Sequence, residues 1–307
     1  MEIDPTTKGK ELVRLWDSVK DLMSLDEFSE ALSRTRSAVR SEIYRERRKG
    51  NIYSDIKILI FDIETSMIKF WGFRTGQQYV SPRQVTEDWY MLSWAAEWLD
   101  SDEVLSSVLT PEEAISRDDK RICADLWELF NEANIIVAHN LKGFDRKKAN
   151  WRFLVHGFMP PLPYKMVDTL TESRKYFGPT SHGLDYILQE LGMRHKLETK
   201  DTLWKNCMKG KQKSLTKMQK YNIQDVVILK KLYIKYLPWM ETHPNVNLYS
   251  DNSDSKCRNC GSDVEYSDKL ITTGVNAYKT YRCKSCNHVG RVVDSETTKK
   301  QRDKLLR

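Results

Sequence analysis

Two carboxylates stand one residue apart in the apolar run Ile60-Phe-Asp-Ile-Glu-Thr65, which is typical of a β-strand. Because side chains alternate between the two faces of a strand, Asp62 and Glu64 share one face. Two neighbouring negative charges repel each other unless a cation neutralises them, and carboxylate oxygens are ligands of divalent cations. Acid pairs at strand ends are also common as solvated groups, so this pair by itself leaves a metal site and a solvated face open.

Two further acids and a tyrosine add to this pair. Asp145 follows the apolar strand-like run at residues 135–140, close to where a helix begins near residue 143, and α/β sheets place ligands at such strand ends. Tyr221 and Asp225 are four residues apart on an expected helix, so they share one face. Alone, that pair is better interpreted as a core tyrosine beside a surface acid. In combination with the other acids it favours a catalytic set.

The elements that must position these side chains indicate an α/β domain over residues 54–240. The expected strands are residues 57–64, 91–99, 104–109 and 135–140, and an amphipathic helix is expected at residues 119–131. Helices dominate from there to residue 239. The other expected segments are a three-helix domain at 1–50, a polar linker at 241–255, a cysteine-rich module at 256–294 and a charged tail at 295–307.

The chemically interesting residues fall into three groups: Phe61-Asp-Ile-Glu64, Asn140 with Phe144-Asp145, and Tyr221 with Asp225. In this order they resemble the three motifs of the DEDD exonuclease superfamily. The tyrosine is typical of the DEDDy branch, because Lys220 stands where the histidine branch has its histidine. Residues 54–240 are similar to the proofreading domain of family B DNA polymerases, and to stand-alone polymerase-B-like exonucleases of tailed phages.

This resemblance implies a ribonuclease H-like α/β fold, with a mixed sheet centred on residues 57–64 and helices on both faces. It implies a metal-dependent 3′-5′ exonuclease that cuts DNA, single-stranded or at 3′ ends, into 5′-mononucleotides. Asp62, Glu64 and Asp225 would hold one Mg²⁺ or Mn²⁺. Asp62 would bridge to a second ion, which Asp145 would support through water. Tyr221 would orient the attacking water.

Substrate contacts implied by the same motifs are Thr65, Asn140, Lys142, Phe144 and Arg146. A phosphate backbone could bind the basic residues around Asp145, although a charged helix face is as often only solvated; these residues are Lys142, Arg146, Lys147, Lys148 and Arg152. Aromatic residues that could stack on bases are Trp71, Phe73, Trp89, Trp94 and Trp98, although core packing is expected for most of them. His139 is expected to be a buried strand residue rather than a ligand.

Four of the six cysteines form two CxxC pairs, Cys257 with Cys260 and Cys283 with Cys286. This spacing predicts a four-thiolate Zn²⁺ site, and Gly261 after the first pair suits the sharp turn of a thiolate knuckle. The metal would supply the folding energy of so small a module. The module resembles the zinc ribbons of replication and transposition proteins, for which DNA contact and protein docking are equally open. Cys123 and Cys207 are expected to be ordinary reduced thiols.

The N-terminal segment resembles a helix-turn-helix unit. Its expected third helix, from about residue 35 to 48, exposes Arg36, Ser37, Arg40 and Ser41, which suits the major groove of DNA. Ser33 replaces the usual turn glycine, and a three-helix protein-docking bundle is the alternative.

Composition narrows the classes of protein further. The net charge of +7 is compatible with a polyanionic partner, and 40% hydrophobic residues exclude a largely disordered chain. No apolar run suggests a membrane span or a signal peptide, so we expect a cytoplasmic protein, in the bacterial host if it is phage-encoded. Expected partners are DNA and replication or recombination proteins. Two alternatives stay open: a catalytically silent DNA-binding or recruitment protein, and a transposase-like endonuclease.

Overall fold

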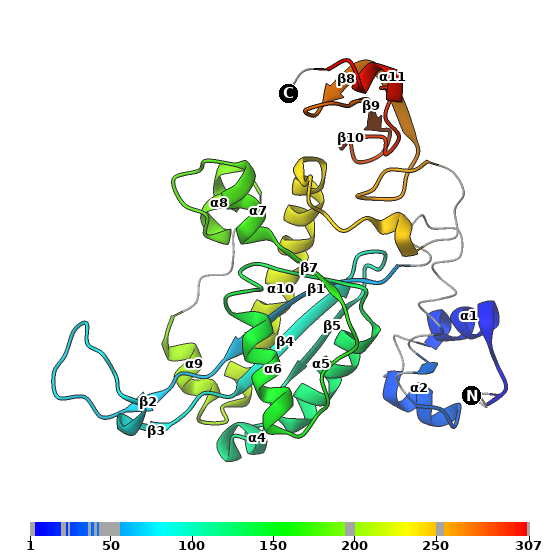
Figure 1. Cartoon of the computed structure of the whole chain (residues 1–307). Coiled ribbons are helices and arrows are strands. Elements are labelled where there is room, and N and C mark those ends of the chain that lie inside the picture. Colours follow the sequence, from blue (N-terminus) through cyan, green and yellow to red (C-terminus); the bar gives the residue numbers. More distant parts are fainter. Residues whose placement is uncertain are drawn as a thin grey trace.

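The computed structural model describes residues 4–19, 23, 25–35, 38–39, 42, 56–193, 200–249 and 255–305. Its centre is a five-stranded sheet of order β5-β4-β1-β6-β7 (Figure 1). The strands are β1 (Ile58–Thr65), β4 (Met91–Trp98), β5 (Val104–Val108), β6 (Ile135–Ala138) and β7 (Lys165–Asp168). The middle strand β1 pairs antiparallel with β4 and parallel with β6. The mixed α/β sheet predicted around residues 57–64 is therefore confirmed.

Helices cover both faces of this sheet. Side chains of β1 alternate between two cores, with Leu59 and Phe61 in one core and Ile58 and Ile60 in the other. The first core contains α5, α6, α9 and the start of α10, and the second contains α8 and the rest of α10. The helices are α4 (Pro111–Ser116), α5 (Lys120–Glu132), α6 (Asp145–Val155), α7 (Thr169–Tyr176), α8 (Leu184–Glu190), α9 (Thr202–Cys207) and α10 (Gln212–Tyr236). Within the described ranges, no helix has the length and apolar character needed to cross a bilayer.

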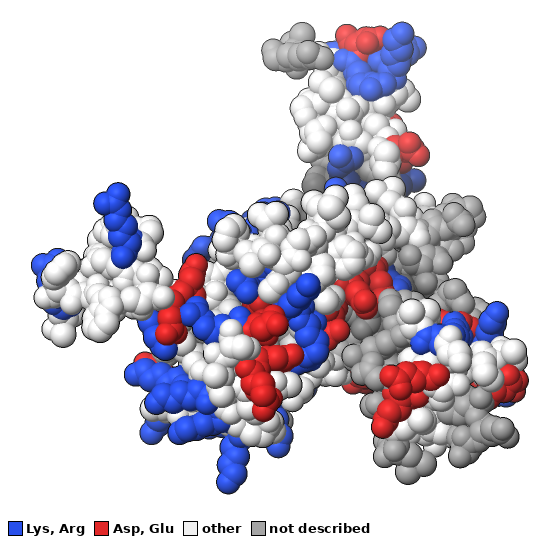
Figure 2. Space-filling model, turned by 90° about the horizontal axis from the view of Figure 1, so that it is seen from below, with Lys and Arg blue, Asp and Glu red and all other residues white. Residues whose placement is uncertain are grey.

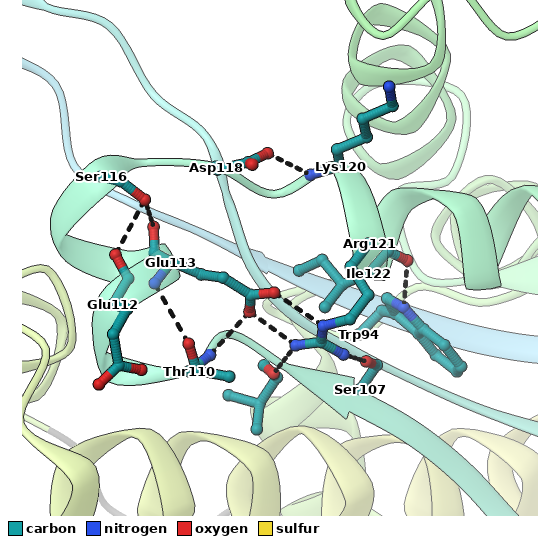
Figure 3. Close-up of polar contacts among 11 residues, drawn as sticks. Trp94, Ser107, Thr110, Glu112, Glu113, Ser116, Asp118, Lys120, Arg121 and Ile122 are labelled. Atoms are coloured by element: carbon teal, nitrogen blue, oxygen red, sulfur yellow. Dashed lines mark hydrogen bonds and ion pairs between the residues drawn. The ribbon is translucent and has the colours of Figure 1, made fainter. Parts of the chain in front are cut away.

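A polar cluster fixes the start of α5 to the sheet (Figure 3). The guanidinium of Arg121 donates to both carboxylate oxygens of Glu113, at 2.8 and 2.7 Å, and to Ser107 Oγ on β5 at 3.1 Å. Trp94 Nε1 on β4 donates to the carbonyl of Ile122 at 2.7 Å. The predicted helix at residues 119–131 is thereby held against two strands.

An arm separates β1 from β4. Its strands are β2 (Lys69–Phe70) and β3 (Val85–Glu87), with the 3₁₀ helix η1 (Pro82–Gln84) before β3. The arm extends away from the body of the molecule, at the left in Figure 1. Its strands are too short for a hydrophobic pattern to predict them.

The N-terminal helices have a core of their own. Helices α1 (Gly9–Val19) and α2 (Leu25–Ala31) meet through Trp16 and Phe28, whose ring centroids are 5.1 Å apart. Ser33 follows with a φ of 53°, a left-handed conformation that suits a tight turn. The candidate DNA contacts Arg36, Ser37, Arg40 and Ser41 lie outside the described residues.

The C-terminal module is a three-stranded sheet of order β10-β9-β8. Its elements are β8 (Val264–Thr272), β9 (Ala277–Cys283), β10 (Val289–Arg291) and α11 (Lys299–Arg302). Before it lie η2 (Leu237–Trp239) and η3 (Val246–Tyr249). In the segment where the sequence predicts a linker, Val246 belongs to the core of α8 and α10 and His243 is buried. This part of the segment is packed rather than extended.

Candidate functional site

Three carboxylates converge where β1 ends. Asp62 and Glu64 lie on β1 and Asp225 on α10, and one oxygen from each lies within 4.8 Å of the others. Asp225 is buried, while Asp62 and Glu64 are half-buried. The pairing of β1 with β4 shifts register between Glu64 and Thr65, which ends the regular ladder at this point. Oxygen atoms at this spacing suit a shared divalent cation.

Asp145 joins this group from the first turn of α6. Burial raises the pKa of its carboxyl well above the ordinary value, and the negative charge of Asp62 raises that pKa further. A hydrogen bond from the backbone N–H of Ile63 acts in the opposite direction. Asp145 therefore lies against β1 beside Asp62, where a bound cation would favour its ionised form.

Two residues that the sequence analysis did not single out orient the β1 carboxylates. Asn222 Nδ2 donates to Asp62 Oδ2 at 2.7 Å, and Ser93 Oγ donates to Asn222 Oδ1 at 3.1 Å. Trp204 Nε1 on α9 donates to Glu64 Oε2 at 3.3 Å. Asn222 is fully buried on α10. An amide among apolar helix positions is the sequence signal that could have found it.

Tyr221 lies one helical turn before Asp225 and is 9% exposed. Its ring meets that of Trp204 edge-on, with 6.2 Å between the centroids. Since Trp204 also bonds Glu64, the tyrosine lies on the Glu64 side of the acids. The structure thus gathers around one strand end the four acids and the tyrosine that the sequence placed in three distant motifs.

Asp168, at the end of β7, shapes the turn that carries Asp145. Its carboxylate accepts the backbone N–H groups of Asn140 at 3.0 Å and of Lys142 at 2.9 Å. Asn140 has a φ of 69°, and a Cβ placed on Gly143 would come within 2.4 Å of Asn140 Oδ1. A side chain at 143 would therefore displace the Asn140 amide from its position in this turn. An acid at the end of a parallel strand was the sequence signal for Asp168.

Residues 95–237 match the model of the RNase_H superfamily. The match runs from within β4 through α10 and contains Asp145, Tyr221 and Asp225, while β1 lies before its first residue. No curated protein matches the chain. The match and the mixed sheet agree on an RNase H-like domain, which suggests a nuclease activity, nucleic-acid binding and the use of divalent metals.

The other predicted substrate residues of the RNase H-like domain lie around this strand end. Thr65 is half-buried at the end of β1, and Lys142 is exposed before α6. Phe144 is partly exposed, and the Nζ of Lys148 lies 5.6 Å from its ring centroid. Burial raises the pKa of Tyr164, and the positive charge of the half-buried Arg146 opposes that rise, so Arg146 lies near this phenol. An open cavity of about 900 Å³ adjoins this region and includes Asn140 in its lining.

The prediction that His139 is a buried residue within a strand is wrong. The strand β6 ends at Ala138, so His139 lies just beyond it, half-buried, with Nδ1 3.0 Å from Thr169 Oγ1. The apolar run predicted two more strand residues than the sheet contains. The reason is the turn at Asn140, whose backbone N–H donates to the side chain of Asp168 rather than to the backbone of a neighbouring strand.

A second group of possible metal ligands in the RNase H-like domain has a structural role. Asp119 lies close to Cys123 and His156, within the distance of a shared metal ion. Its carboxylate already accepts the guanidinium of Arg152 at 2.7 and 2.5 Å and the backbone N–H of Met91 at 2.7 Å. These bonds satisfy the buried charge and hold Arg152, a predicted backbone-binding residue, away from that use.

The candidate stacking residues divide by exposure. Trp94 and Trp98 are each 2% exposed within the first core, so they are core residues. Trp89 is covered by Lys148, whose Nζ is 3.7 Å from the ring centroid. Trp71 and Phe73, on the arm, are exposed.

The four cysteines of the C-terminal module form a compact group whose sulfur atoms lie within 4.8 Å of one another. The Sγ–Sγ distances are 3.7 Å for Cys257 and Cys286 and 3.4 Å for Cys260 and Cys283. A tetrahedral zinc site requires about 3.8 Å, so the group fits a metal ion. Gly261 has the left-handed conformation that the sequence suggested, with a φ of 73°, and Asn287 has the same conformation after the second cysteine pair, with a φ of 63°.

This module is joined to the end of α10. Asn259 Nδ2 donates to the carbonyls of Leu237 and Met240, at 2.8 Å each. His288 Nδ1 lies 2.9 Å from the carbonyl of Pro238. Three of the cysteines belong to the same core as α8 and α10, so α10 links the cysteine group to Asp225.

Proposed function

We propose that this chain is a metal-dependent 3′-5′ exonuclease that hydrolyses the phosphodiester bonds of DNA, in single strands or at 3′ ends, and releases 5′-mononucleotides. The observation that carries the proposal is the convergence of Asp62, Glu64 and Asp225 at the end of β1, with Asp145 beside them. The RNase_H superfamily match supports the nuclease class. The tyrosine one turn before Asp225 supports the DEDDy type.

In this proposal the residues of the chain prepare the site before substrate arrives. Asp62, Glu64 and Asp225 would hold one Mg²⁺ or Mn²⁺, and Asp62 with Asp145 would support a second. When bound, two such ions would stabilise the negative charge that develops on the attacking and leaving oxygens during phosphodiester hydrolysis. Asn222 and Trp204 orient the two β1 carboxylates. Tyr221 orients the attacking water through its hydroxyl.

The substrate end is positioned by the turn before α6. Phe144 packs against the terminal base, and Lys142 contacts a phosphate. Thr65, Asn140 and Arg146 complete this surface. The preference for DNA rests on the flanking parts, a helix-turn-helix domain at residues 1–50 and a zinc ribbon at 256–294 whose cysteines hold one structural Zn²⁺. Partners in this scheme are replication or recombination proteins in the cytoplasm of a bacterial host.

Digestion of a 5′-labelled single-stranded oligonucleotide with Mg²⁺ or Mn²⁺ tests the proposal. We expect a ladder that shortens from the 3′ end and is lost in Asp62→Asn, while the exposed-site control Asp268→Asn retains it. A matching RNA measures the preference for DNA. Cleavage of circular DNA would identify an endonuclease instead, and binding without metal-dependent cleavage would identify a DNA-binding scaffold.

A further inference from the structure

The arm between β1 and β4 presents large aromatic side chains to solvent. Trp71, Phe73 and Tyr79 are 78%, 97% and 86% exposed. Aromatic side chains normally contribute their surface to a core, so three exposed within nine residues mark an interaction surface. We call residues 69–87 the arm and these three side chains its aromatic tip.

All charged residues of the arm are basic, except its last residue, Glu87. Between Glu64 and Glu87 the charged residues are Lys69, Arg74 and Arg83, all basic. Lys69 is paired with Glu87 at the base of the arm, at 2.7 Å. Arg74 and Arg83 are exposed nearer the tip. On the face shown in Figure 2, the protruding arm at the left carries basic atoms and no acidic ones.

The arm holds its shape by its own hydrogen bonds. The backbone N–H of Trp71 donates to the carbonyl of Gln84 at 2.9 Å, and Gln84 Nε2 donates back to the carbonyl of Trp71 at 3.0 Å. Ser81 and Gln84 form a capping box that starts η1. Trp71 is thus exposed on an ordered backbone, which lowers the entropic cost of binding.

The arm leaves β1 a few residues after Glu64 and returns directly into β4, the neighbouring strand. A ligand bound along the arm therefore leads to the acids at the end of β1. Single-stranded nucleic acid fits both features of the arm, because aromatic rings stack on bases of any sequence and arginines neutralise the phosphates.

We propose that the arm is a binding surface for single-stranded nucleic acid. Bases stack on Trp71, Phe73 and Tyr79, while Arg74 and Arg83 contact the backbone. This proposal rests on the proposed exonuclease, since the bound strand is the one whose 3′ end reaches Asp62 and Glu64. The arm then holds nucleotides that lie beyond the active site. It therefore increases the affinity for long strands, whereas very short strands do not reach it.

Fluorescence anisotropy of a labelled 20-nucleotide single strand tests the arm separately from hydrolysis. In the Asp62→Asn background, Trp71→Ala combined with Phe73→Ala should weaken binding at least about tenfold. Trp239→Ala, which removes an exposed tryptophan from η2, is the matched control and should leave binding unchanged. Arg74→Ala with Arg83→Ala should reduce the slope of log affinity against log salt by about 1.4.

In the active chain, the aromatic double variant should retain its rate on a dinucleotide and lose rate on the 20-nucleotide strand. Unchanged affinity of that variant, with native circular dichroism, would overturn the proposal. A second result would also overturn the proposal: the wild type is a dimer, and the aromatic double variant is a monomer with unchanged affinity for nucleic acid. The aromatic tip would then bind a second copy of the chain. The anisotropy measurement needs no hydrolysis. If the exonuclease proposal alone fails, the wild-type chain will therefore bind the strand without cutting it.

Discussion

Asn222 carries no charge, yet it connects Asp62 to the interior of the sheet through its bonds to the carboxylate and to Ser93. In the proposed reaction it would act through Asp62, as a positioning residue. Residues that orient metal-binding carboxylates affect metal affinity and rate together.

We expect Asn222→Ala to lower the exonuclease rate roughly 10- to 100-fold and to raise the Mg²⁺ concentration needed for half-maximal activity. Gln219→Ala is the control, since Gln219 lies on the same helix and bonds Ser106 on β5 at 3.0 Å. Metal titration of the initial rate is the measurement. An equal loss in both variants, without a shift in metal dependence, would show that only helix stability had changed.

His243 links the RNase H-like domain to the cysteine module and is held neutral. Burial lowers its pKa from 6.5 to about 4. Its two hydrogen bonds fit a neutral ring: Nδ1 lies 2.8 Å from the carbonyl of Pro244, and Nε2 lies 2.8 Å from the hydroxyl of Tyr233. The first nitrogen donates and the second accepts, which a doubly protonated ring cannot do.

A lowered folded-state pKa makes the protein less stable in acid, because the unfolded histidine binds a proton below pH 6.5 and the folded one does not until about pH 4. From pH 7.5 to 5, His243 should reduce the free energy of unfolding by about 2 kcal/mol. Urea unfolding of the wild type and of His243→Gln at both pH values measures this. Equal pH dependence in the two proteins would contradict the assignment.

At the scale of elements, α10 has two roles: it carries residues of the candidate site, and it contacts the cysteine module. Its middle carries Tyr221, Asn222 and Asp225, and its end is bonded by Asn259 and His288 of the cysteine module. The strand β1 supplies Asp62 and Glu64, and its central place in the sheet buries its backbone between two helical layers. The geometry of the site therefore depends on how α10 crosses β1.

We propose that the four cysteines hold Zn²⁺, and removal of that ion should loosen the end of α10. A zinc-selective chelator, or Cys260→Ser, should lower the melting temperature by roughly 2–4 °C for each kcal/mol lost, and added Zn²⁺ should restore the chelated protein. Elemental analysis should find one zinc in the wild type. If the chelator leaves the melting temperature unchanged, the module contributes nothing to the stability of the domain it contacts.

At the scale of the whole molecule, the parts differ in how they are joined. The N-terminal helices have a core of their own, whereas the cysteine module shares the core of α8 and α10. The arm extends from the carboxyl end of β1, the end that carries Asp62 and Glu64 (Figure 1). The arm, which is the proposed binding surface for nucleic acid, and the candidate catalytic centre thus meet at one strand end.

Local patterns determined much of this in advance. The strand period placed Asp62 and Glu64 together, the four-residue spacing placed Tyr221 above Asp225, and the two CxxC pairs predicted a four-sulfur group. Each depends only on neighbours along the chain, whose geometry is regular.

The tertiary structure alone decided which remote residues complete the site. Asn222 and Trp204 reach acids that lie 160 and 140 positions away in the sequence, so no local period could predict those bonds. Burial likewise separated the exposed Trp71 from the core residue Trp94, although both are tryptophans near strands. Hydrogen-bond partners and exposure depend on how distant elements pack, and that packing is absent from the spacing of residues along one strand or helix.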